Sequence, residues 1–148
     1  MSKQTLPSIK KIEYNPVTET ELYPKRILTP NDTISVIGNF TKLNMTEPAQ
    51  CETTTAQTAN GLIYTSKITG SIFDEQNEGI QNKLQVLYHN YILTDIYGQK
   101  YLVGIKEKPF PEILFSPINE ASPSGRRVVN FEITWISTLP PIKIVDLA

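Results

Sequence analysis

The chain has 148 residues, of which 14 are basic and 15 acidic, for a formal net charge of −1, and it carries a single cysteine, Cys51. This balance excludes attraction of nucleic acid or of an anionic membrane by an overall electrostatic field, and one cysteine excludes an internal disulfide scaffold. No run approaches the roughly 18 apolar residues of a membrane helix, so we expect a soluble, single-domain protein that contacts no membrane.

Prolines recur through the first 30 residues, at Pro7, Pro16, Pro24 and Pro30. Each proline lacks an amide donor and fixes φ, which argues against a regular helix or a central strand. Apolar pairs lie between the prolines, and a purely disordered tail would not need them. We therefore predict that residues 1–30 form an extended arm that docks on another surface.

A strand over residues 33–40, in which Ile34 and Val36 alternate with polar residues, opens the predicted domain over residues 31–138. Residues 44–61 then differ in character, because they are rich in Thr, Ala and Gln and almost lack large apolar side chains. They predict either a loop or a long hairpin whose pairing partner lies on another subunit. The loop is the commoner outcome. Candidate subunit-interface residues in this segment are Thr53, Thr54 and Thr55.

Residues 62–73 alternate in the manner of a long strand, and a short amphipathic helix follows over about residues 75–89. The Asp74 carboxylate suits the N-cap of this helix, since it can accept hydrogen bonds from the amides of the first turn. The spacing of its apolar side chains is helical, and they are Ile80, Leu84 and Leu87.

A hairpin is predicted over residues 91–105, because Gly98 supplies the positive φ of a tight turn between two apolar stretches. Residues 106–123 hold four prolines interspersed with apolar side chains, and they predict a rigid loop that packs across a sheet edge.

The clearest strand of the chain covers residues 126–137, with alternating apolar side chains at Val129, Phe131, Ile133 and Trp135. The pair Pro140–Pro141 then redirects the chain into an extended apolar tail over residues 139–148. Arginine is frequent at assembly contacts, although two charges at the start of a strand serve equally well as solvated ends or edge protection. An apolar tail is underused in a monomer. Further candidate interface residues are therefore Arg126, Arg127, Ile142 and Ile144.

Catalytic chemistry has little support in the sequence. His89 is the only histidine, and its place at the predicted helix C-terminus suits a partly charged ring that complements the helix dipole. Cys51 has no basic neighbour to lower its pKa, and residues 79–83 lack the spacing of a phosphate loop. We predict no catalytic residue, no cofactor and no metal site, and hence a protein that is not an enzyme.

The order of the predicted elements resembles that of tail and neck proteins of tailed bacteriophages, most closely those of crAss-like phages of gut Bacteroidetes. The resemblance is carried by Lys67–Ile72, Asn77–Leu84, Tyr91–Asp95 with Tyr101–Gly104, and Val128–Ile136. It implies a mainly β (α+β) fold, namely an antiparallel β-sandwich or barrel flanked by one short α-helix, with extended N- and C-terminal arms.

The resemblance also implies a structural virion protein, assembled in the host cytoplasm, that forms a ring as tail tube, tail terminator or head-to-tail connector. Its partners would be further copies of itself and neighbouring tail or neck proteins, with transient, non-specific contact with DNA in the lumen. The alternative is a small non-catalytic β-sandwich that binds sugar or peptide through residues 106–123 and exposed tyrosines. The burial predicted for Trp135 weighs against that alternative, because it removes the obvious aromatic platform.

Overall fold

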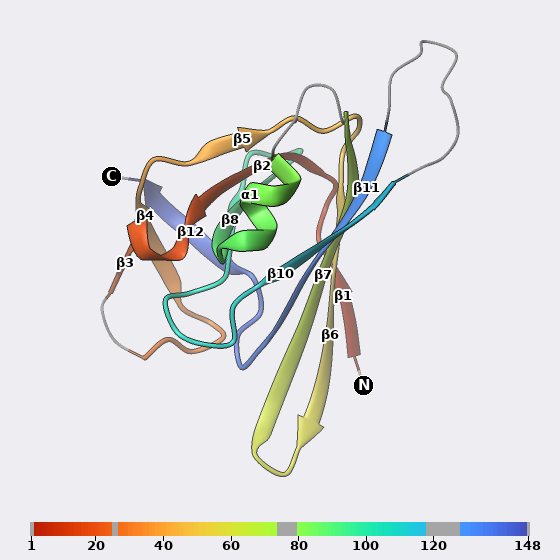
Figure 1. Cartoon of the computed structure of the whole chain (residues 1–148). Helices are drawn as coiled ribbons and strands as arrows, with labels where there is room; N and C mark the ends of the chain where they lie inside the picture. Colours follow the sequence, from red (N-terminus) through yellow and green to blue (C-terminus); the bar gives the residue numbers. More distant parts are fainter. Residues whose placement is uncertain (1, 25–26, 74–79, 118–127, 148) are drawn as a thin grey trace.

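The computed structural model describes residues 2–24, 27–73, 80–117 and 128–147, which form strands, one α-helix and one short 3-10 helix (Figure 1). The helices are η1 (Val17–Glu19) and α1 (Ile80–Val86). The strands are β1 (Ser2–Thr5), β2 (Ile9–Pro16), β3 (Glu21–Tyr23), β4 (Thr33–Ile37), β5 (Thr41–Leu43), β6 (Gln50–Thr58), β7 (Gly61–Phe73), β8 (His89–Asp95), β9 (Lys100–Val103), β10 (Glu112–Pro117), β11 (Val128–Ser137) and β12 (Ile142–Leu147).

These strands make two sheets. The first has the order β1-β6-β7-β11-β10, and the second has the order β3-β4-β12-β9-β8-β2-β5. Strand pairs are antiparallel except β4 with β12, which run parallel. Side chains from both sheets and from α1 share one hydrophobic core. The predicted mainly β sandwich flanked by a short helix is therefore confirmed.

Strand β11 shows why alternation predicts this architecture. Val129, Phe131, Ile133 and Trp135 are buried, whereas the residues between them face outward or are half-buried. Each apolar side chain gains roughly 1.5–3 kcal/mol on full burial, so the side with these residues must face the core. The indole Nε1 of Trp135 donates a hydrogen bond to the carbonyl oxygen of Pro109 at 3.1 Å, which satisfies its polar atom inside the core.

The prediction of an extended N-terminal arm over residues 1–30 is wrong for most of this segment. Strand β2 lies between β8 and β5, and Ile9 and Ile12 are fully buried. The prolines interrupt no strand interior: Pro7 precedes β2, and Pro16 is its last residue. Because strand ends tolerate a missing donor, proline spacing here marks the boundaries between strands.

The C-terminal tail is also a core strand rather than an arm. Strand β12 lies between β4 and β9, and both Ile142 and Ile144 are buried. Two apolar side chains that seemed unused in a monomer, Ile142 and Ile144, fill the core of the same chain, whereas Val145 is exposed.

The Thr-rich segment forms strand β6, so the loop prediction is wrong and the hairpin prediction is right except for the partner. Its pairing partner is β7 of the same chain, from Gln50 opposite Thr69 to Thr58 opposite Gly61. Threonine suits this position because a β-branched side chain packs well on a pleated surface.

The helix and the proline-rich loop also differ from their predictions. Helix α1 ends at Val86, so it is shorter than predicted at its C-terminus, and His89 begins β8. Asp74 lies outside the described residues. Within the predicted loop of residues 106–123, residues 112–117 instead form strand β10, at one edge of the first sheet.

Candidate assembly surface

The hairpin of β6 and β7 projects past the other strands of its sheet (Figure 1). Strand β1 covers β6 only as far as Thr55, and β11 covers β7 only from Tyr64 onward. Among the described residues, the segment 56–63, here called the hairpin tip, is therefore paired only with itself. At about 3.3 Å per residue, the tip reaches roughly 10 Å beyond the covered part of the sheet.

The composition of the tip is unusual for an exposed hairpin. From Thr53 to Ser66 the sequence holds no charged residue, and Leu62 exposes 47% of its surface. Natural proteins usually protect open strand edges with charges, bulges or prolines. The tip is thus an uncharged ribbon whose two edges are unpaired in the part of the chain that the structure describes, and it lacks these protective features.

The turn of the tip is built locally. The Thr58 hydroxyl donates to the carbonyl oxygen of Gly61 at 2.8 Å and accepts from the amide of Asn60 at 3.2 Å. Gly61 has a φ of +111°, which favours glycine at this position. The conformation of the turn is thus set by residues within the tip.

The candidate interface residues separate into three groups. Thr53 is buried, with its hydroxyl 3.2 Å from that of Ser66, while Thr54 and Thr55 are half-buried at the base of the tip. Ile142 and Ile144 are buried in the core of their own chain and offer no surface to a neighbour. Arg126 and Arg127 lie outside the described residues.

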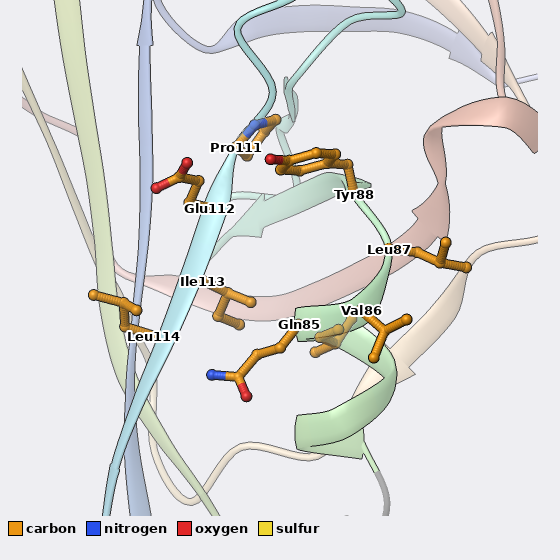
Figure 2. A pocket seen from close by; sticks show the side chains of 9 residues that line it. Gln85, Val86, Leu87, Tyr88, Pro111, Glu112, Ile113 and Leu114 are labelled. Atoms are coloured by element: carbon orange, nitrogen blue, oxygen red, sulfur yellow. The ribbon is translucent and has the colours of Figure 1, made fainter.

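A second feature is a groove of about 350 Å³ between α1 and β10, here called the α1–β10 groove (Figure 2). Ile113 and Gln85 point into the space between helix and strand, while Leu114 turns to the other side of β10 and Leu87 points away from it. Val86 and Leu114 expose 77% and 65% of their surfaces. Of the groove-lining residues, Glu112 alone carries a charge.

A third feature is a recess of about 520 Å³ where three segments meet that are far apart in the sequence. The N-terminal segment, the β6–β7 hairpin and the C-terminal segment each contribute, through Gln4, Pro7, Thr53, Tyr64, Pro141 and Lys143. The three segments predicted to reach other subunits are thus brought together within one chain.

Neither His89 nor Cys51 has the surroundings of a catalytic group. His89 is buried, and this burial lowers its pKa, so its ring is neutral rather than a charged partner of the helix dipole. Burial, with a smaller effect of Glu52, raises the pKa of the Cys51 thiol to about 12. Within the described ranges, no cluster of His, Cys, Asp and Glu is arranged to hold a metal ion, and no helix is long and apolar enough to span a bilayer.

No protein-family model matches the chain, and neither a curated protein nor a solved structure matches it. The geometry of the chain is therefore the basis of the functional argument.

The sequence placed most of the tip in a segment, residues 44–61, that could pair with another subunit, but the interface residues it suggested, Thr53, Thr54 and Thr55, lie at the hairpin base. The groove was missed. The charge-free run from Thr53 to Ser66 is visible in the sequence and could have marked the tip. The groove has no comparable signal, because it depends on how α1 packs beside β10.

Proposed function

We propose that this chain is a structural subunit that assembles into a ring in the tail or neck of a tailed phage, as tube, terminator or connector. The observation that supports self-assembly best is the uncharged hairpin tip, which projects from the sheet with both edges unpaired among the described residues. A two-stranded ribbon alone is only marginally stable in water, so a neighbouring copy that covers it would stabilise it.

Charge and shape agree with this role. A net charge of −1 gives a channel wall little attraction for passing DNA, which must slide through a tail without being held. A projecting tip on one part of the surface and a groove on another allow contacts between unlike faces. Such contacts close into a ring when the rotation between copies permits it.

The test is the molar mass in solution, measured by light scattering after size exclusion, for the full chain and for a variant with a shortened hairpin. In the variant, Asn-Gly replaces residues 57–62, so that Ala56 and Ile63, which face each other in the ladder, are joined by a two-residue turn. This change leaves β2 and β12 in the core, whereas removal of residues 1–29 would delete β2.

We expect the full chain to form a defined oligomer and the shortened variant to be a monomer. Two matched variants distinguish an effect of the tip from the effect of a new surface charge. They are Leu62→Lys in the tip and Ile136→Lys on β11, where the native side chains expose 47% and 51% of their surfaces. Only Leu62→Lys should dissociate the oligomer. A monomeric full chain at all concentrations would overturn self-assembly.

A second candidate function, binding of sugar or peptide, is favoured by the recess of about 520 Å³, which both Tyr64 and Tyr101 line. Its size lies within the range of small-ligand sites. Trp135 cannot contribute, because it is fully buried. This function predicts a monomer in which Tyr64→Ala abolishes ligand binding but leaves the molar mass unchanged.

A further inference from the structure

We propose that the hairpin tip of one copy docks in the α1–β10 groove of a second copy of this chain. The inference rests on the proposed self-assembly and specifies which two surfaces meet.

The two surfaces match in charge and polarity. The tip carries no charged residue and presents Leu62, while Glu112 is the one charged side chain among the residues that line the groove. The buried Ile113 and the exposed Gln85 point into the space, so its interior presents apolar and uncharged polar side chains. Assembly interfaces are depleted of charge at their centres, so an uncharged tip is the kind of segment that this groove would accept.

The backbones match as well. Strand β10 is the last strand of its sheet, so among the described residues one of its edges is unpaired. Two prolines limit that edge, because Pro111, which precedes the strand, and Pro117, its last residue, have no amide to donate. The tip offers equally short open edges, from Ala56 to Thr58 and from Gly61 to Ile63. An extended segment that pairs with a free strand edge gains main-chain hydrogen bonds, and the adjacent groove adds side-chain contacts.

A single chain cannot make this contact with itself. The ladder between β6 and β7 holds the tip at the far end of the hairpin, away from α1 and β10 (Figure 1). The tip of one copy must therefore enter the groove of the next, which leaves its own groove free for a third copy. This head-to-tail arrangement is the kind that produces rings.

Disulfide trapping between two differently tagged preparations tests the contact. One carries Leu62→Cys in the tip, and the other carries Gln85→Cys, an exposed position that points into the groove. The native Cys51 is buried and should not compete. The matched control replaces the exposed Gln50 on β6 with cysteine. We expect a mixed disulfide between the tags for the Gln85→Cys partner and only background for the Gln50→Cys partner.

A second measurement does not depend on cysteine chemistry. Gln85→Glu adds a charge, at almost unchanged size, to a side chain that points into the groove, and we expect it to weaken self-association about tenfold or more, because docking would bury that charge against an uncharged tip. An oligomer that persists without the tip-to-groove disulfide, and that tolerates Gln85→Glu, would overturn this inference and leave the proposed assembly intact. A chain that stays monomeric throughout would overturn both.

Discussion

The imidazole Nδ1 of His89 lies 2.8 Å from the carbonyl oxygen of Leu87, two residues earlier in the chain. A carbonyl oxygen can only accept, so Nδ1 carries the hydrogen of a neutral ring and donates it. The other nitrogen, Nε2, is buried and has no hydrogen-bond partner among the described residues. This environment favours the neutral ring, and the pKa of His89 is lowered, chiefly by burial.

The first prediction is that acid destabilises the fold through His89. An unfolded chain binds a proton at this histidine below about pH 6.5, whereas the folded chain does so only at lower pH. The contribution to stability is therefore complete above about pH 6.5 and is lost as the pH falls below it, by at most about 1.4 kcal/mol per pH unit. His89→Gln should flatten this part of the profile, measured by urea unfolding at pH 7.5 and 5.5. Equal pH slopes for the two proteins would contradict the prediction.

The second prediction compares two glycines that share a positive φ. Gly104 has a φ of +99°, and a Cβ there would lie 2.7 Å from Pro111 and 2.8 Å from Asn90. Gly98 has a φ of +89°, but a Cβ there would meet nothing within 4 Å. Gly98→Ala should therefore cost about 1–2 kcal/mol for backbone strain alone, and Gly104→Ala about 1–3 kcal/mol more for overpacking. Thermal unfolding by calorimetry measures the difference, and equal costs would refute the steric contribution.

The third prediction concerns Thr53, which the sequence suggested as an interface residue. Thr53→Val leaves the buried Ser66 hydroxyl without its partner 3.2 Å away, and should cost about 1–3 kcal/mol of stability. Ser66→Ala in addition should recover part of that loss, because neither polar group then remains. Light scattering should show an unchanged oligomer. Dissociation by Thr53→Val, with stability unchanged, would instead support a direct role in assembly.

The fourth prediction is that Cys51 is unreactive in the folded protein. Its thiol is buried, and its pKa is raised to about 12, so almost no thiolate is present at pH 8. A chromogenic disulfide reagent should modify the native protein only at the rate of unfolding and should react at once in urea. Rapid modification without denaturant would show that β6 opens locally.

The alternation of apolar and polar residues predicted those strands that bury one face in the core and expose the other. Strand β11 and most of β7 read correctly because buried apolar residues alternate with polar ones. Strand β8 is buried on both faces, so alternation of polar and apolar residues does not reveal its burial. His89 and Asn90 are buried in this strand, although the sequence suggests the end of a helix there.

The errors at the two termini have a tertiary origin. Proline spacing argued against β2, yet Pro16 ends that strand and leaves its interior ladder intact. Strand β12 pairs in parallel with β4, from the first third of the chain, and no local signal encodes such a partner.

The same limit applies to the assembly surface. The uncharged run from Thr53 to Ser66 is a property of the sequence, but its meaning depends on where β1 and β11 stop beside it. That end point is a property of the folded sheet, and it turns a polar segment into an open ribbon.

The buried indole of Trp135 gives the chain an internal fluorophore with a single environment. It is the sole tryptophan, it is fully shielded from solvent, and its N–H is held by Pro109. The ring lies opposite Ser66 in the ladder, outside the hairpin tip, so we expect docking to leave it covered, whereas unfolding exposes it to water. We therefore expect a large red shift in tryptophan emission on loss of the core and no such shift on assembly, so that the two equilibria can be followed separately in one sample.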